Sequence, residues 1–149
     1  EKVYNQDFLA LVDYAHSPDS VENALSFLQE IKKGRLIAIV GCGGDRDRTK
    51  RPKMALVACQ KADLAILTSD NPRTENPENI LKDMCEGLNY TNYCVIVNRK
   101  EAIQKAISMA QAGDVIAVLG KGHEDYQIIG TTKYHFSDKE EILKAIKGE

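Results

Sequence analysis

The fold is indicated most clearly by the stretch RLIAIVGCGG at residues 35–44, a continuous apolar run that ends in a glycine-rich turn. A strand that is apolar at every position is buried on both faces, which is typical of a parallel sheet covered by helices on each side. Residues 18–33 before it and 51–62 after it carry apolar side chains at helical spacing. This region therefore predicts a helix–strand–helix unit of an α/β protein.

The same alternation continues outward along the rest of the chain. The sequence predicts core strands at residues 9–12, 35–40, 64–68, 94–97 and 114–119. It predicts helices at residues 18–33, 51–62, 77–86, 99–112 and 138–147. A hairpin at residues 125–129 and 133–136 is expected to add an antiparallel edge. Residues 1–149 are thus interpreted as one domain with a Rossmann-like open, mostly parallel sheet, helices on both faces and a C-terminal antiparallel hairpin.

Composition excludes several classes of protein. The chain has 149 residues and a net charge of −2, with 43% hydrophobic and 28% charged residues, which is typical of one globular domain. These values argue against a disordered chain and against a strongly basic nucleic-acid coat. No apolar run approaches the roughly 18 residues of a membrane span. Because the charge is balanced and no such run is present, neither a nucleic acid nor a membrane is expected as a partner. The first residue is Glu1 and not Met, which suggests a fragment or a processed chain.

The four cysteines show neither a C-x-x-C pair nor zinc-site spacing, so no metal site is predicted. Cys59 and Cys94 lie in apolar stretches and are expected in the core. The expected compartment is the cytosol, where thiols stay reduced.

Four polar clusters follow predicted strands directly. Because ligands of open α/β sheets bind beyond the carboxyl ends of the strands, these clusters are predicted to form one site. The clusters are Asp13-Tyr14-Ala15-His16, the segment from Gly41 to Arg48, Asp70-Asn71-Pro72-Arg73 and Gly120-Lys121-Gly122-His123-Glu124.

The glycine-rich cluster has two interpretations. Glycines at 41, 43 and 44 would let backbone amides approach an anion closely, and the charges from Asp45 to Arg51 favour an anionic ligand. The alternative is a tight turn with solvated charges. A nicotinamide-binding fingerprint is rejected, because Arg46 stands where its third glycine would be and because the turn follows the second strand and not the first.

The other clusters also allow a structural or a functional interpretation. Asp70-Asn71-Pro72 is good turn chemistry, yet Pro72 stiffens the loop and directs Arg73, whose guanidinium suits a carboxylate. The glycine loop at 120–124 either leads into the hairpin or offers Glu124 to an ammonium group, with Lys121 and His123 as candidates for phosphate or carboxylate. Asp13 could accept from ribose hydroxyls, while His16 could simply enter the next helix.

Together the clusters offer cations and anions on one rim, which suits a zwitterion such as an amino acid. The sequence contains no Ser-His-Asp, H-E-x-x-H, G-x-S-x-G or P-loop pattern, so no residue is assigned a catalytic role. The residues alone predict an α/β domain that binds a small charged metabolite.

The ordered strings resemble the C-terminal domain of the Mur ligases, in particular the members that add meso-diaminopimelate; folylpolyglutamate synthases are similar more remotely. The strings are VDYAHSPDSVENAL (12–25), GCGGDRDRTKRPKMA (41–55), TSDNPRTENP (68–77) and GKGHEDYQ (120–127). The resemblance implies a cytoplasmic three-domain enzyme whose N-terminal domain holds the UDP-sugar. Its central domain holds ATP, Mg²⁺ and a carbamylated lysine, and both domains lie outside this chain.

The implied reaction is ATP-dependent. ATP phosphorylates the terminal carboxylate of UDP-N-acetylmuramoyl-L-alanyl-D-glutamate, and the amine of the incoming amino acid attacks the acyl phosphate. The isolated chain is therefore expected to be inactive.

The resemblance also implies roles for individual residues. The pocket for meso-diaminopimelate would consist of Arg46, Asp70, Asn71, Pro72, Arg73, Gly120 and Glu124. In the family the DNPR string accompanies meso-diaminopimelate, and lysine-adding members lack its arginine. Arg73, assisted by Arg46, would pair with the distal carboxylate, while Glu124 and the Gly120 carbonyl would hold the distal ammonium. Asp13, Tyr14 and His16 resemble residues that face the nucleotide. A lysine-adding ligase and a stand-alone, non-catalytic metabolite-binding module are the alternatives.

Overall fold

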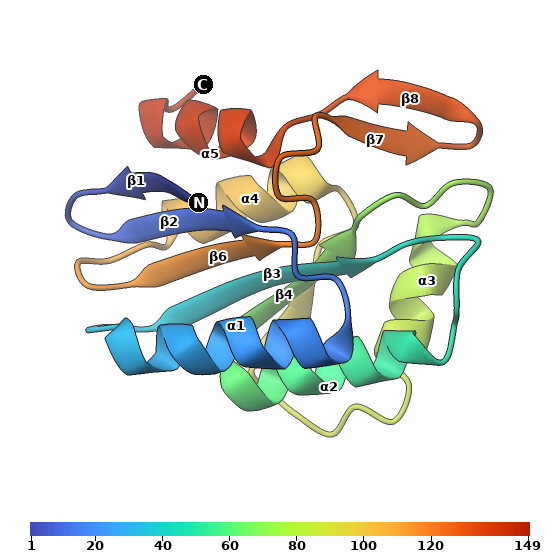
Figure 1. Ribbon diagram of the computed structural model, residues 1–149, viewed down its shortest axis with the longest axis horizontal. Helices are drawn as coiled ribbons and strands as arrows, with labels where there is room; N and C mark the ends of the chain where they lie inside the picture. Colours follow the sequence, from blue (N-terminus) through green and yellow to red (C-terminus); the bar gives the residue numbers. More distant parts are fainter.

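The apolar runs form the parallel part of a six-stranded sheet in the computed structural model, which describes residues 1–149 (Figure 1). The order across the sheet is β1-β2-β6-β3-β4-β5, with β1 antiparallel to β2 and all other pairs parallel. The strands are β1 (Lys2–Asn5), β2 (Leu9–Asp13), β3 (Leu36–Cys42), β4 (Leu64–Ser69), β5 (Tyr93–Val95) and β6 (Val115–Leu119).

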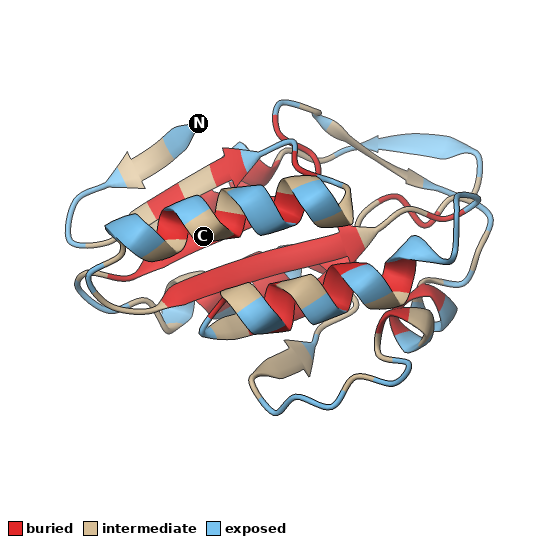
Figure 2. Ribbon diagram, turned by 60° about the horizontal axis from the view of Figure 1, so that its bottom comes forward, coloured by how far each residue is buried: buried red, intermediate tan, exposed pale blue.

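Helices cover both faces of this sheet, as the continuously apolar strands require. One face carries α1 (Pro18–Ile31), α2 (Lys50–Lys61) and α3 (Pro77–Met84), and the other carries α4 (Arg99–Ser108) and α5 (Asp138–Lys147) (Figure 1). Strand β3 is buried along nearly its whole length (Figure 2). Its side chains alternate between two cores, with Ala38 and Val40 in one and Ile37 and Ile39 in the other.

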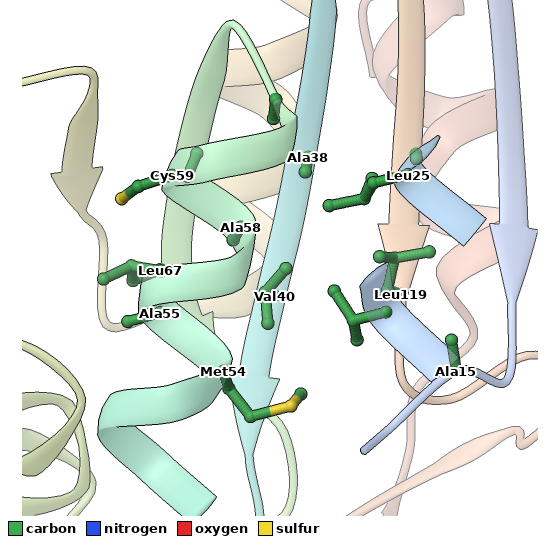
Figure 3. Packing of buried hydrophobic residues seen from close by; sticks show 14 of the residues in the cluster. Ala15, Leu25, Ala38, Val40, Met54, Ala55, Ala58, Cys59, Leu67 and Leu119 are labelled. Carbon is green, nitrogen blue, oxygen red and sulfur yellow. The ribbon is translucent and has the colours of Figure 1, made fainter. Parts of the chain in front are cut away.

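The larger core lies between the sheet and α1, α2 and α3. Figure 3 shows Leu25 of α1 and Met54, Ala55 and Ala58 of α2 gathered over the strand that carries Val40. Cys59 is buried there, and Cys94 packs at the edge of the second core, as predicted. All four cysteines are free.

The structure corrects the predicted edge of the sheet. The hairpin of β7 (Tyr126–Ile129) and β8 (Thr132–His135) forms a separate two-stranded sheet and adds no edge to the main one. The antiparallel edge is β1, which sequence reasoning did not predict because its four residues are too few and too polar to show a period. The mostly parallel α/β fold with a C-terminal hairpin is confirmed.

Some helices and strands begin or end a few residues away from their predicted bounds. The helix predicted at 99–112 ends at Ser108, and the strand predicted at 94–97 is only Tyr93–Val95. None of the helices has the length and apolar character needed to cross a membrane.

Candidate functional site

A pocket of about 410 Å³ lies where the strands β2, β3, β4 and β6 end, bounded by the four loops that follow them. The carboxyl ends of parallel strands meet at one edge, so clusters far apart in the sequence come together there. Most of the residues singled out from the sequence line this pocket: Tyr14, His16, Arg46, Asp70, Asn71, Arg73, Gly120 and Glu124.

Two of the predicted site residues do not line it. Pro72 is buried and lies against the backbone of Gly44, outside the pocket. The Asp13 carboxylate accepts a hydrogen bond from the amide of Ala15 at 2.9 Å, and the Asp13 carbonyl accepts from Gly120 at 3.0 Å. Asp13 therefore shapes the turn that presents Tyr14 and His16, and it does not itself face the pocket.

Arg46 and Arg73 are the pocket arginines, and neither forms an ion pair with a carboxylate of this chain. Nη1 of Arg73 donates to the carbonyl oxygen of Gly44 at 3.0 Å, and Nη1 of Arg46 donates to the carbonyl oxygen of Asp45 at 2.9 Å. These contacts orient both guanidinium groups and leave their charges uncompensated. The pocket is thus suited to an anionic ligand with carboxylate geometry.

The neighbouring arginines have a different role. Arg48 pairs with Asp83 at 3.0 Å, outside the pocket. Arg51 is 1% exposed and pairs with both Glu75 and Asp83. The charged residues that follow β3 therefore have two different roles. Arg46, Asp47 and Lys50 line the pocket, whereas Arg48 and Arg51 form ion pairs outside it.

The glycines at the end of β3 and directly after it are required for close packing, and the anion nest stays a prediction. A Cβ on Gly41 would lie 2.7 Å from the carbonyl oxygen of Thr68, and one on Gly44 would overlap the carbonyl of Pro72. The amide of Gly44 is already used, since it donates to the carbonyl of Asn71 at 2.7 Å. Gly43 leaves space for the guanidinium of Arg73, which a Cβ would approach to 2.9 Å.

Lys121 is buried and does not face the pocket, contrary to its candidacy for an anion contact. Its ammonium donates to Oδ1 of Asn71 at 2.8 Å and to the carbonyl of Tyr126 at 3.0 Å, and it lies 3.0 Å from Oδ1 of Asp70. His123 is exposed and lies 3.1 Å from the carboxylate of Glu1, also outside the pocket. Of the charged residues in this loop, only Glu124 lines the pocket.

Three carboxylates line the pocket, those of Asp47, Asp70 and Glu124. The Asp70 carboxylate points toward Gly120, where a Cβ would be 3.3 Å from Oδ2 and where the backbone has a φ of +115°. The negative charge of Glu124 raises the pKa of the nearby Tyr126 phenol above its ordinary value. Burial raises the pKa of the Cys42 thiol to about 12, so this pocket cysteine stays protonated at neutral pH and is a poor nucleophile.

The pocket is also built by residues that sequence reasoning missed. Arg99 is fully buried beneath it and donates to the carbonyl oxygens of Ser69 and Leu119, both at 3.1 Å, where β4 and β6 end. Tyr126 was given no role either, and Arg51 was predicted only as part of a charged run that favours an anionic ligand, not as a buried residue. An arginine within an expected amphipathic helix gives no local signal that it is buried, so only its position in space shows its role.

The hairpin forms backbone hydrogen bonds with the loop that carries Arg73. The amide of Arg73 donates to the carbonyl of Ile128 at 3.0 Å, and the amide of Gly130 donates to the carbonyl of Arg73 at 2.7 Å. Oδ1 of Asn71 also accepts from the Ile128 amide at 3.0 Å. These contacts explain why the hairpin forms its own sheet, since its inner strand pairs with this loop.

The chain is similar in sequence to known ligases of one family. The family model described as "Mur ligase, glutamate ligase domain" matches residues 1–122. A UDP-N-acetylmuramoyl-L-alanyl-D-glutamate–2,6-diaminopimelate ligase of Clostridium acetobutylicum is 52% identical over 143 residues, which cover 96% of this chain and 30% of that protein. The enzyme of the same name from Synechocystis sp. is 55% identical, over 95% of this chain and 28% of its own length.

Solved structures of similar proteins have the same fold. A structure of a UDP-N-acetylmuramoyl-L-alanyl-D-glutamate–2,6-diaminopimelate ligase superimposes with a TM-score of 0.96 at 43% identity, over 99% of this chain and 31% of that one. A folylpolyglutamate synthase/dihydrofolate synthase from Yersinia pestis, at 20% identity and a TM-score of 0.60 over 78% of this chain and 26% of its own, shares the fold. The chain thus spans about 30% of the length of the curated relatives that it matches.

Proposed function

Because the chain belongs to the Mur ligase family, we propose that it is the amino-acid-binding C-terminal domain of a ligase that adds meso-diaminopimelate to UDP-N-acetylmuramoyl-L-alanyl-D-glutamate. The remainder of the protein would supply an N-terminal UDP-binding domain and a central domain that binds ATP and Mg²⁺. The ligase would act in the cytoplasm, on a peptidoglycan precursor.

The observation that supports this function is that one pocket holds two arginines without an ion-pair partner, Arg46 and Arg73, together with the carboxylate of Glu124. The other carboxylate named for this site, Asp70, is paired with the buried Lys121. Meso-diaminopimelate carries a carboxylate and an ammonium at each end, so its distal end can engage both signs of charge at once. Arg73 would pair with the distal carboxylate with help from Arg46, while Glu124 and the Gly120 carbonyl would hold the distal ammonium.

The same pocket disfavours lysine. Lysine has no distal carboxylate, so its ammonium would stand near a guanidinium that keeps no partner. A site built to pair with a polar group rejects an analogue that lacks it, because its own charged groups are left unsatisfied. The lysine-adding alternative is therefore the less favoured one.

The chemical contribution of this domain is binding and orientation. Its residues would hold the amino acid with its attacking amine directed out of the pocket, toward the carboxylate that ATP activates in the rest of the enzyme. No group of three or more histidine, cysteine or acidic side chains comes together in this chain, and the family resemblance implies that Mg²⁺ binds together with ATP in the central domain. The metal is accordingly assigned to the central domain, and Tyr14 and His16 to the side that faces the nucleotide.

The test uses the full-length protein with ATP and UDP-N-acetylmuramoyl-L-alanyl-D-glutamate. We expect ATP-dependent ligation with meso-diaminopimelate and little with lysine. Arg73→Ala should raise the KM for meso-diaminopimelate by roughly a hundredfold, the loss of a bidentate ion pair, while leaving the KM for ATP unchanged. Lys33→Ala, an exposed change outside the pocket, is the control. Equal use of both amino acids would contradict the proposed specificity, and absence of any ligation would contradict the proposed activity.

A further inference from the structure

Two non-glycine residues of this chain have a left-handed backbone. One directly precedes a pocket arginine, and the other is a pocket arginine itself. Asp45 has a φ of 55° and directly precedes Arg46, while the second such residue is Arg73 itself, with a φ of 53°. A left-handed conformation is unfavourable for a residue with a Cβ and persists only where surrounding contacts impose it. The loop after β3 therefore has a strained backbone at Asp45, directly before Arg46. The loop after β4 has one at Arg73 itself.

The contacts that impose this shape run between the two loops. The Asp45 carboxylate accepts from the hydroxyl of Thr74 at 2.8 Å and from the amide of Thr74 at 3.2 Å. The amide of Asp45 donates to the carboxylate of Glu75 at 2.7 Å. In return, the guanidinium of Arg73 donates to the carbonyl of Gly44 at 3.0 Å. Each strained residue is thus fixed by the loop that carries the other arginine.

A buried cation anchors both loops from beneath. Arg51 donates to the carbonyl of Gly43 at 3.1 Å and to Oδ2 of Asp83 at 2.9 Å, and it also pairs with the carboxylate of Glu75. We call the set Asp45, Arg51, Thr74 and Glu75 the loop clamp. None of its members lines the pocket, so they act on a ligand through the pocket residues that they hold in place, which include Arg46 and Arg73.

We propose that Asp45, together with Thr74, is a positioning residue that sets the distance between Arg46 and Arg73 and thereby the preference for a distal carboxylate. This inference rests on the proposed function. The Asp45–Thr74 contact joins the residue before one pocket arginine to the residue after the other. If that contact is lost, the loops shift relative to each other and the two guanidinium groups no longer meet one carboxylate. Small displacements of this kind weaken bidentate recognition strongly.

The experiment uses the full-length ligase, four variants of the Asp45–Thr74 contact and one control variant. Asp45→Ala and Thr74→Val remove the contact, whereas Asp45→Asn and Thr74→Ser retain an acceptor or a hydroxyl and serve as conservative partners. Thr132→Val, on exposed strand β8, is the matched control. We expect the two disruptive variants to raise the KM for meso-diaminopimelate roughly tenfold, the effect of one lost hydrogen-bonded contact. Their preference for meso-diaminopimelate over lysine should fall by a similar factor.

The KM for ATP and kcat should stay within about twofold of the parent enzyme, and the conservative variants should restore most of the lost affinity. A purely structural role would instead lower the melting temperature and reduce turnover with both amino acids alike, and this result would overturn the inference. An unchanged KM in both disruptive variants would also overturn it. Failure of the parent enzyme to use meso-diaminopimelate would overturn the proposed function itself, and the inference with it.

Discussion

Arg99 and Asp138 form an ion pair from which solvent is fully excluded, with Nε and Nη2 of the guanidinium donating to the two carboxylate oxygens at 2.8 and 2.7 Å. The pair joins the first residue of α4 to the first residue of α5, and the same guanidinium holds the ends of β4 and β6. One buried cation therefore connects the helical layer to the edge of the sheet that carries the pocket.

Asp138→Asn should destabilise the chain by about 3 to 5 kcal/mol, because it leaves the buried charge of Arg99 uncompensated. Urea unfolding at neutral pH, followed by circular dichroism, measures the free energy of unfolding. Lys100→Ala, at the exposed neighbouring position, should change it by less than about 0.5 kcal/mol. Equal stabilities of the two variants would contradict a structural role for the pair.

Lys121→Met should loosen the loop that carries Arg73. The change leaves Oδ1 of Asn71 and the Asp70 carboxylate without their buried cation, at a cost of about 3 kcal/mol. Hydrogen exchange should accelerate at the amides of Arg73 and Ile128, while the amides of β3 keep their protection relative to global unfolding. Lys144→Met, on the exposed face of α5, is the control, and matching exchange patterns in the two variants would disprove the effect.

Gly44→Ala tests whether this glycine is needed for close packing. The added Cβ would overlap the carbonyl of Pro72, so the loop must shift, with an expected cost of about 3 kcal/mol. Gly87→Ala should cost only roughly 1 kcal/mol, since no atom lies within 4 Å of the added Cβ and the strain comes from its φ of +70° alone. The two melting temperatures provide the comparison. A milder effect at position 44 than at position 87 would be incompatible with this packing.

Stability should fall at acidic pH partly through two carboxyls that pair with Arg51, those of Glu75 in the loop clamp and of Asp83 beside it. A hydrogen bond from Arg51, followed by one from the Asp45 amide, lowers the pKa of Glu75 below its ordinary value of 4.5. A hydrogen bond from Arg48, followed by one from Arg51, lowers the pKa of Asp83 below 3.8. Both carboxyls bind protons more readily in the unfolded chain, so their stabilisation is present above these ordinary values and is lost as the pH falls through the lowered ones.

Urea unfolding of the chain between pH 6 and pH 3 measures this dependence. Glu75→Gln should be less stable than the parent at pH 6, and the difference should shrink as the pH falls below the ordinary value of 4.5 and through the lowered pKa of Glu75 in the folded chain. Glu78→Gln, at an exposed position in the first turn of α3, should show no comparable loss. A difference between Glu75→Gln and the parent that is constant with pH would refute the assignment.

The 149-residue chain by itself is expected not to catalyse ligation, because it spans about 30% of the length of the ligases that it matches and the family resemblance assigns ATP and Mg²⁺ to a central domain. Incubation with ATP, Mg²⁺, meso-diaminopimelate and UDP-N-acetylmuramoyl-L-alanyl-D-glutamate, followed by product detection, checks this expectation. The full-length protein is the positive control. Product formed by the chain alone would require a catalytic centre within these residues.

The alternation of strands and helices was determined locally by the sequence. Runs such as Leu36–Val40 are apolar at every position, and a strand of that kind is stable only between two helical layers. The parallel order then brings the turns after Asp13, Cys42, Ser69 and Leu119 to one edge. Periodicity therefore predicted both the fold class and the location of the pocket.

Only the tertiary structure decided which charged residues face the pocket. Arg46 and Arg51 stand five positions apart in one run, yet the first faces the pocket and the second is buried against Glu75. Lys121 is neutralised by Asp70, and the hairpin pairs with the Arg73 loop and not with the main sheet. The physical reason is the same in each case: burial and hydrogen bonding depend on partners distant in sequence, which no local pattern specifies.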